Sequence, residues 1–427
     1  MNIPKRKAVY CILAAIAVVA VCAAAVAIAA VTKRSALIPE GEELSSADEA
    51  VVSETSEELR AIWIPYYSEL DITPKKIDGM VEKCRDCGFN AIMFHVRAFG
   101  DAMYESDVFP WSHIACGAQG EAPANDFDPL AYIIEKAHEN GMELHAWINP
   151  LRIQFEGGTC PKNLSPDNPY CVWRGDDNAE NDAWVVDYNG GKYYNPAFPE
   201  VRQLIADGIS EIVERYDVDG IHWDDYFYPA EDESFGDGEQ YEAFIKAGGQ
   251  GDMLSWRTDN INLLVRQSYA AVKELRPDCV FGISPAGNID NCLHAGADVY
   301  EWCSHAGYID YICPQVYWPF ESEVAPFDRR CLEWRDMIKT DGIRFYVGLA
   351  LYKGGSPEAD SGLWSERDDI IAEQIEYCRS DVLDSDGYMV FAYDDLLSEQ
   401  AAAECRNMIR ANLGEYTAAS NSDAVIE

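Results

Sequence analysis

Apolar runs alternate with amphipathic stretches along most of this chain. Eight short runs rich in Val, Ile, Phe, Tyr and Trp have the length and composition of buried strands. Amphipathic helical stretches lie between most of them, and several begin with Pro and end at Gly or Asn, as helices commonly do. This alternation predicts an α/β fold consisting of a single (β/α)₈ barrel. The predicted strands are 60–65, 90–97, 142–149, 218–224, 280–284, 308–317, 344–349 and 387–393.

The N-terminal segment differs from the rest of the chain. Residues 8–31 contain no charged or strongly polar side chain. This run is long enough for a helix that crosses a bilayer. Basic residues 5–7 precede this run and favour a cytoplasmic N-terminus with an external remainder. A cleaved signal peptide is the alternative, because small residues near the end of the run suit a cleavage site. We expect a membrane anchor at 1–34, an acidic linker at 35–57, the barrel at 58–413 and a disordered tail at 414–427.

Charge and composition narrow the range of partners. The formal net charge is −41 and the pI is about 4.3, which disfavours nucleic acid or an anionic membrane surface as a ligand. Such a charge suits neutral or cationic ligands, and it serves solubility equally well. Hydrophobic residues make up 48% of the chain and support a large core. No glycine-rich phosphate loop is present, and we expect no cofactor.

The chain contains 14 cysteines, and twelve of them lie beyond the predicted anchor. Outside the cell this number suggests disulfides, but several of the cysteines fall inside predicted strands or helices. That placement favours buried free thiols. Cys160 and Cys171 both lie in a predicted loop and are the pair best suited to a disulfide. Cys84 and Cys87 form a CxxC pair without a second one, which makes a zinc site unlikely.

The segment 218–229 combines two carboxylates with several aromatic residues. Ile221 alternates with His222 and Asp224, so the last two share one face of a strand. Catalytic groups of such barrels collect at the C-terminal strand ends, where Asp224 is predicted to project. Burial there would raise its pKa for general-acid work. Asp225 has the opposite parity, and we expect it to cap a loop or contact Arg97.

Carboxylates among aromatic rings suit glycoside hydrolysis, because the acids transfer protons and the rings stack on sugars. The usual scheme needs a second carboxylate, and Asp225, Asp394, Asp395 and Glu301 are the candidates. We therefore predict a catalytic set of Asp224, Asp225 and Asp394. The other strand ends supply the predicted substrate-binding side chains, which are His95, Arg97, Trp147, Asn149, His222, Tyr226, Asn288, Gln315, Tyr317 and Trp318.

Three other kinds of function compete with glycoside hydrolysis. His95, His145 and His222 lie on neighbouring predicted strands, which suggests a metal-dependent hydrolase as an alternative. The His-x-His pair that often opens such barrels is absent, however. Serine chemistry is disfavoured because Ser284 lacks the Gly-x-Ser-x-Gly surroundings of a nucleophile elbow. A non-catalytic glycan-binding barrel would need the aromatic and polar side chains but no second carboxylate near Asp224.

Ordered sequence blocks from residue 58 to about 393 resemble the glycosyl hydrolase-like family 10 proteins of bacterial envelopes. This resemblance implies a TIM barrel and a glycosidase-type site with Asp224 at the family's strand-four carboxylate position. It also implies an extracellular glycan as substrate, with the cell wall as one source. Trp223 departs from the phenylalanine more often found in that block. The blocks are LRAIWI (59–64), VRAFGDA (96–102), DPL (128–130), AWINP (146–150), YNP (194–196), DVDGIHWDDY (217–226), GISP (282–285) and YIDYICPQ (308–315).

Overall fold

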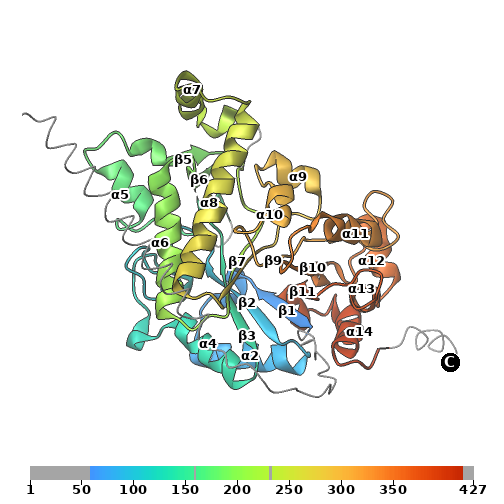
Figure 1. Cartoon of the computed structure of the whole chain (residues 1–427). Coiled ribbons are helices and arrows are strands. Elements are labelled where there is room, and N and C mark those ends of the chain that lie inside the picture. The colour runs from blue at the N-terminus through green and yellow to red at the C-terminus, as the bar shows by residue number, and fades with distance from the viewer. Residues whose placement is uncertain (1–57, 158–159, 230–232, 417–427) are drawn as a thin grey trace, which may run out of the picture. The chain divides into compact units, whose positions relative to one another are not determined.

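The computed structural model describes residues 58–157, 160–229 and 233–416, and within them eight parallel strands close into a barrel (Figure 1). Around the barrel the strands follow the order β1, β2, β3, β7, β8, β9, β10 and β11 before returning to β1. The predicted barrel is therefore confirmed. Its strands are β1 (Leu59–Ile64), β2 (Ala91–Arg97), β3 (Glu143–Ile148), β7 (Gly220–Trp223), β8 (Val280–Ile283), β9 (Tyr311–Ile312), β10 (Arg344–Ala350) and β11 (Gly387–Phe391).

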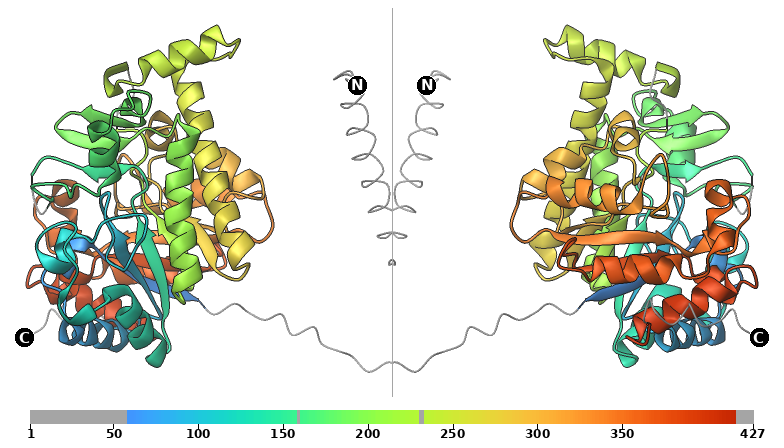
Figure 2. Two further views of the ribbon diagram at one scale, coloured as in Figure 1. Left: turned by 90° about the vertical axis from the view of Figure 1, so that its left-hand side faces the viewer. Right: turned by 90° about the vertical axis from the view of Figure 1, so that its right-hand side faces the viewer.

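Helices pack around the outside of the barrel, and Figure 2 shows α6 and α8 side by side against it. Local sequence explains where the helices begin: the Asp128 side chain accepts a hydrogen bond from the Ala131 N–H, and Pro129 occupies the first turn. The longer helices are α2 (Pro74–Asp86), α4 (Pro129–Glu139), α6 (Pro199–Arg215), α8 (Met253–Leu275), α11 (Phe327–Met337) and α14 (Ala402–Asn412). The shorter ones are α3 (His113–Cys116), α5 (Pro169–Gly175), α7 (Gly238–Lys246), α9 (Ile289–His294), α10 (Val299–Ser304), α12 (Leu363–Glu366) and α13 (Ile370–Cys378).

Successive side chains of each strand point to opposite faces of the barrel wall, and they therefore belong to two different apolar layers. Ile221 and Trp223 of β7 belong to the layer between the barrel and its helices, whereas His222 contacts the barrel interior. The interior contains large rings, among them Tyr311. A Cβ atom on Gly282 would lie 2.2 Å from the Tyr311 ring, so glycine at this position of β8 leaves the space that the ring fills. The interior is thus packed with side chains, and the open space lies above it.

A small antiparallel sheet of order β4-β6-β5 stands beside the barrel and was not predicted. Its strands are β4 (Arg152–Gln154), β5 (Val185–Tyr188) and β6 (Gly191–Tyr194). Asn189 and Gly190 connect β5 to β6 with φ values of 47° and 77°, the left-handed geometry that a two-residue hairpin turn requires. The sheet belongs to the long insertion after β3, and it places Arg152 and Tyr193 at the barrel mouth.

All twelve cysteines in the described residues are free. The expectation of a disulfide between Cys160 and Cys171 is therefore wrong, while the expectation of buried free thiols holds for most of the others. Cys160 Sγ instead accepts a hydrogen bond from the Phe155 N–H at 3.2 Å. Cys84 and Cys87 are buried in the apolar layer under α2. These sulfur atoms contribute to packing rather than to crosslinks.

The predicted anchor, the predicted linker up to residue 57 and the tail beyond residue 416 lie outside the described residues. None of the helices within the described ranges combines the length and the apolar character needed to span a bilayer. At the other end of the described residues, Tyr416 is buried and donates its hydroxyl to Asp369 at 3.1 Å.

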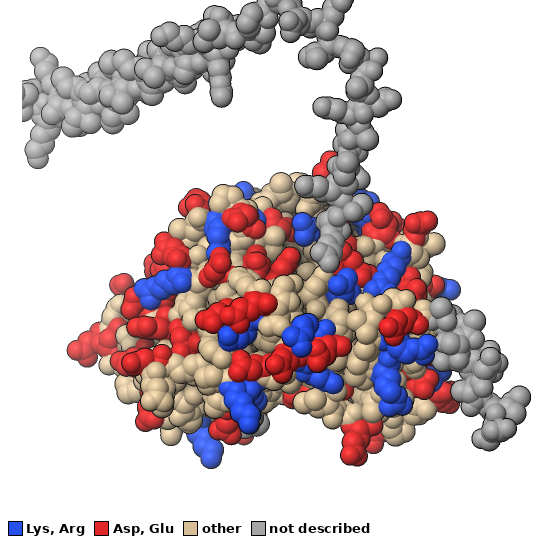
Figure 3. Space-filling view, turned by 90° about the horizontal axis from the view of Figure 1, so that it is seen from below, with Lys and Arg blue, Asp and Glu red and all other residues tan. Residues whose placement is uncertain are grey.

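Charged side chains of both signs are mixed over the surface. Figure 3 shows one face on which Asp and Glu side chains lie among Lys and Arg side chains. Many of them are paired, for example Arg379 with Glu58 at 2.7 Å and Arg276 with Asp217 at 3.1 Å. On this face the acidic residues do not form a separate patch, so the net charge by itself does not mark a binding surface there.

Candidate active site

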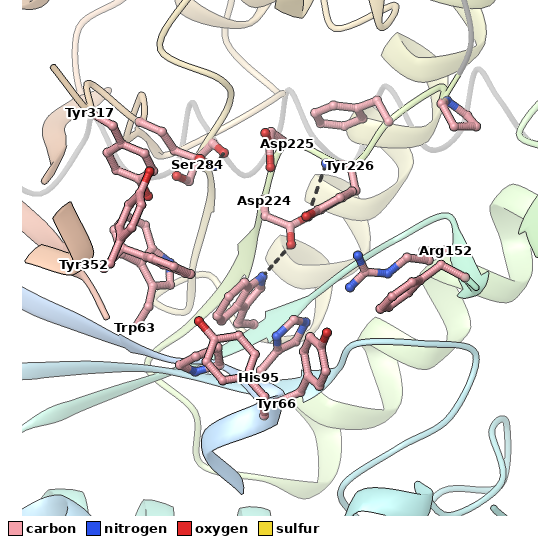
Figure 4. A pocket seen from close by; sticks show the side chains of 18 of the residues that line it. Trp63, Tyr66, His95, Arg152, Asp224, Asp225, Tyr226, Ser284, Tyr317 and Tyr352 are labelled. Carbon is pink, nitrogen blue, oxygen red and sulfur yellow. Dashed lines mark hydrogen bonds between the residues drawn. The ribbon is translucent and has the colours of Figure 1, made fainter. Parts of the chain in front are cut away.

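A cavity of about 650 Å³ opens at the C-terminal ends of the barrel strands (Figure 4). Its volume falls in the range of roughly 300–1,000 Å³ that is usual for ligand sites. Nearly every strand contributes to it, which explains why polar and aromatic side chains recur at the strand ends in the sequence. Its lining consists of Trp63, Pro65, Tyr66, Tyr67, His95, Trp147, Arg152, Phe155, Tyr193, Asp224, Asp225, Tyr226, Phe227, Tyr228, Pro229, Ser284, Gln315, Tyr317, Tyr352 and Phe391.

Asp224 follows β7 directly and is 3% exposed at the base of this cavity. Two donors converge on one of its oxygens: Trp147 Nε1 lies 3.0 Å from Oδ2, and Asn149 Nδ2 lies 3.1 Å from it. The other oxygen, Oδ1, accepts only a long contact of 3.4 Å from the Tyr226 N–H. A proton on this carboxyl group therefore belongs on Oδ1, because Oδ2 already accepts two hydrogen bonds.

The pKa of Asp224 is raised to about 7, mainly by burial and in addition by the nearby charge of Asp225. Arg152 and the hydrogen bond from Trp147 act in the opposite direction and lower this pKa. The balance leaves a carboxylic acid that is partly protonated at neutral pH. This is the state that a general acid needs.

Asp225 lines the same cavity and is half-buried. Burial raises its pKa, whereas a hydrogen bond from Gln315 lowers it. The expectation that Asp225 caps a loop or contacts Arg97 was based on its opposite parity, but β7 ends at Trp223 and the alternation of faces ends with it. Because the charge of Asp225 also raises the pKa of Asp224, the two carboxyl groups titrate as a coupled pair in which both pKa values are raised.

His95 lines the cavity next to Asp224 and stacks on Trp147, with ring centroids 3.7 Å apart and an interplanar angle of 13°. It is almost fully buried, and neither ring nitrogen has a hydrogen-bond partner. Burial lowers the pKa of His95 well below its usual value, and the charge of Arg152 adds to this effect. A neutral imidazole that can donate one hydrogen bond and accept another thus faces the cavity.

Many residues of the lining were not singled out in the sequence, among them Tyr66, Tyr67 and Arg152. Tyr66 and Tyr67 belong to a 3₁₀ turn, η1 (Tyr66–Glu69), that follows β1. Arg152 enters from β4, and its guanidinium lies 4.4 Å from the centre of the Tyr226 ring. The Asn-Gly pair at 189–190 carried a signal for the small sheet, because this dipeptide between β-rich runs indicates a hairpin. No comparable sequence signal marked the turn after β1.

Six of the predicted site residues do not line the cavity, namely Arg97, Asn149, His222, Asn288, Trp318 and Asp394. Arg97 is buried between the barrel and α6, where its guanidinium lies 4.5 Å from the centre of the Phe109 ring. A β-bulge between His95 and Arg97 reverses the alternation and turns Arg97 outward. Asn288 caps α9 by accepting hydrogen bonds from the backbone N–H groups of residues 290 and 291. Two further residues are placed elsewhere: Trp318 packs against the outer apolar layer, and Asp394 is exposed on the turn after β11.

The other candidates for a second carboxylate are also engaged elsewhere. Asp395 accepts a hydrogen bond from the Ala392 N–H at 3.1 Å and caps the turn after β11. Glu301 accepts a hydrogen bond from the Tyr308 hydroxyl at 3.0 Å. Of the four candidates in the sequence, only Asp225 belongs to the cavity lining.

The histidines that raised a metal site do not gather in one place. His222 lies in the barrel interior, where Nε2 accepts from Trp63 Nε1 at 3.0 Å and Nδ1 lies 2.8 Å from the Tyr311 hydroxyl. His145 contacts the same hydroxyl at 3.2 Å and also Glu143, at the opposite end of the barrel from the cavity. No group of three or more His, Cys, Asp or Glu side chains is placed to hold a metal ion within the described ranges.

The family model described as "Glycosyl hydrolase-like 10" matches residues 58–366. The chain belongs to this family. Among curated proteins, the glycosyl hydrolase YngK of Bacillus subtilis (strain 168) is 34% identical over 329 residues, which cover 70% of this chain and 62% of YngK. The glycosyl hydrolase DigH of Escherichia coli (strain K12) is 31% identical over 355 residues, which cover 74% of this chain and 78% of DigH. The chain thus matches less than two thirds of the length of YngK.

Solved structures of several glycosidases share the fold of this chain. A β-galactosidase from Rahnella sp. R3 aligns with a TM-score of 0.55 at 11% identity, covering 84% of this chain and 56% of that one. The glycoside hydrolase domain of PgaB (BpsB) from Bordetella bronchiseptica aligns with a TM-score of 0.52 at 14% identity, covering 82% and 99% of the two chains. At these identities the likeness concerns the barrel architecture and not the substrate.

Proposed function

We propose that this protein is a glycoside hydrolase that acts on a polysaccharide outside the cytoplasm, with peptidoglycan glycan strands as the first candidate substrate. The observation that carries the proposal is the buried acid Asp224, held by Trp147 and Asn149 in an aromatic cavity with a second carboxylate, Asp225. Membership of a glycosyl hydrolase-like family supports it. The external location and the anchor rest on the apolar run at 8–31 in the sequence.

In this proposal, Asp224 donates the proton on Oδ1 to the glycosidic oxygen as the bond to the anomeric carbon breaks. Positive charge develops on the sugar ring at that moment, and the ionised Asp225 stabilises it. Asp225 then acts as the nucleophile or as the base for a water molecule. NMR can distinguish these two roles, because it shows which anomer of the product forms first. The exposed face of Tyr226 and the rings of Tyr317 and Tyr352 offer stacking surfaces for sugars.

Cleavage of purified cell-wall sacculi by the full-length protein tests the proposal. Asp224→Asn should reduce the release of soluble fragments by about 10²–10⁴-fold, the usual contribution of a general acid. Asp225→Asn should cause a loss of similar size. Asp394→Asn is the matched control, because this exposed aspartate lies outside the cavity and its replacement should leave the rate within about twofold.

Two results would contradict the proposal. If Asp224→Asn cleaves sacculi and a panel of other polysaccharides as fast as the wild type, Asp224 is not the acid. If the wild-type protein binds these glycans but releases no fragment from any of them, the barrel is a glycan-binding protein. The presence of Asp225 beside Asp224 argues against a glycan-binding protein, because binding alone does not require a pair of carboxylates.

A further inference from the structure

Arg152 is a cation placed inside the cavity of an otherwise strongly acidic protein. It is the only Lys or Arg among the residues that line the cavity, and its guanidinium points from β4 toward Asp224 (Figure 4). The side chain is 7% exposed, so its charge has lost most of its contact with bulk water. A cation in such a position needs compensation from nearby dipoles, aromatic faces or an anion.

The protein supplies only part of that compensation. Arg152 Nε donates to the Ala98 carbonyl at 3.2 Å, and the rings of Phe99, Phe155 and Tyr226 lie 4.4–5.3 Å from the guanidinium carbon. Within the described residues, no carboxylate lies within 4 Å of its nitrogens in an ion pair, although Asp224 and Asp225 are close enough for Arg152 to lower their pKa values. A side-chain hydrogen bond also links Arg152 to Tyr226. The planar fork of its guanidinium has further N–H groups whose geometry suits an external anion.

A second polar group faces the same space. His95 is 1% exposed, and both of its ring nitrogens lack a partner. Such a group is costly to bury unless a ligand satisfies it. Its electrostatic coupling to Arg152 shows that the two side chains lie near each other. The cavity therefore offers a guanidinium and an imidazole N–H on the side opposite to the rings of Trp63 and Tyr352 (Figure 4).

We infer that Arg152 binds a carboxylate carried by the sugar next to the scissile bond, with His95 as a neighbouring donor, so that the substrate is an acidic glycan. This inference rests on the proposed function. Guanidinium and carboxylate match in geometry and form paired, charge-assisted hydrogen bonds. Sugars carry such a group either as a uronate on the ring or as a carboxyalkyl ether, for example the lactyl group of muramic acid. A neutral glycan would leave the guanidinium without an anionic partner.

Binding of small ligands to the full-length protein tests the inference, with isothermal titration calorimetry as the measurement. The probes are N-acetylmuramic acid, its carboxyl-reduced alcohol, glucuronic acid and glucose. The wild type should bind at least one acid about tenfold or more tightly than its neutral counterpart. Arg152→Met should remove that preference, so that it binds the acid no more tightly than the neutral counterpart. Arg152→Lys should retain part of it. The acid that shows the preference identifies whether a carboxyalkyl ether or a uronate is recognised.

Arg174→Met is the matched control. Arg174 lies on α5 and reaches the same small sheet through the Val185 carbonyl and Asp187, but it does not line the cavity. It should leave the preference unchanged, and thermal midpoints show whether either variant has lost its fold. Equal binding of acid and neutral sugar by the wild type, or a preference that survives in Arg152→Met, would overturn the inference.

The two proposals fail in different ways. A wild-type protein that cleaves glycans without preferring acidic ones refutes the role of Arg152 and leaves the hydrolase intact. A protein that prefers acidic sugars through Arg152 but cleaves no glycan refutes the hydrolase instead. Arg152→Met should shift the pH–rate profile in any case, because Arg152 lowers the pKa of Asp224. A shift that leaves the preference for acidic substrates intact would overturn the inference.

Discussion

At the scale of single residues, the carboxyl group of Asp224 decides what the cavity can do. Its two oxygens differ, because Oδ2 accepts from Trp147 and Asn149 whereas Oδ1 has only the long contact from the Tyr226 N–H. The protein thus positions an acid and also determines which oxygen carries its proton. Two predictions follow from this asymmetry.

The first concerns stability against pH. Burial raises the pKa of Asp224 to about 7, above that of the unfolded chain, so folding favours its protonated form. The stability that depends on this proton is fully present below about pH 4 and is lost as the pH rises through 7. Asp224→Asn should therefore melt near the wild-type temperature at pH 4.5 but several degrees higher at pH 8.5. Calorimetry at the two pH values measures this. An equal difference in melting temperature between variant and wild type at the two pH values would contradict the raised pKa.

The second concerns the pH dependence of catalysis. The hydrogen bond from Trp147 lowers the pKa of Asp224, so Trp147→Phe should raise that pKa and move the alkaline limb of kcat to higher pH. We expect a fall in kcat of about tenfold, because the carboxyl group also loses an orienting contact. The measurement is a pH–rate profile. Trp63→Phe is the control, since Trp63 donates to His222 and not to Asp224. An unchanged limb in Trp147→Phe would count against the assignment of Asp224.

At the scale of elements, alternation along the strands predicted the site only as far as the strands extend. His222 faces the interior as expected, but Asp225 follows the end of β7 and lines the cavity despite its opposite parity. Arg97 turned outward because a bulge inserts one residue into β2, and bulges leave little trace in a single sequence. Positions within regular strands could be predicted, whereas those beyond a strand end or a bulge could not.

The lengths of the strands could also be predicted only in part from the sequence. The predicted strand at 308–317 forms a ladder only at Tyr311–Ile312. Pro314 cannot donate to a neighbouring strand, and this ends the regular pairing early. The small sheet could have been predicted from the Asn-Gly pair at 189–190, but the attachment of β4 to β6 joins residues distant in sequence and has no local signal. Arg152 was missed for that reason.

The packing of β8 against β9 gives a prediction at this scale. Gly282→Ala should destabilise the barrel by about 1–3 kcal/mol, the usual cost of overpacking, because the new methyl group would overlap the Tyr311 ring. Denaturant unfolding measures the change in the free energy of unfolding. Gly79→Ala is the control: this position in α2 has open space around it, so the same substitution should be neutral or stabilise by up to about 1 kcal/mol. Equal effects of the two substitutions would contradict the packing account.

At the scale of the whole molecule, the described part of the chain is stabilised by its apolar layers and not by crosslinks. Its twelve cysteines are free, although the sequence suggests an exported protein. Reduction should therefore leave the thermal midpoint unchanged within about 1 °C, because no disulfide worth the usual 2–4 kcal/mol is lost. Thermal scans with and without dithiothreitol measure this. A drop of several degrees on reduction would show that crosslinks contribute to stability.

The acid and the cation of the cavity are carried by separate parts of the fold. Asp224 follows a barrel strand whose neighbours complete a closed ring, whereas Arg152 lies on a three-stranded sheet within one insertion. Changes in that insertion can alter which glycan is admitted without disturbing the proton donor. Under the proposed function, exchange of this insertion would redirect the protein to a different polymer while the carboxylate chemistry is kept.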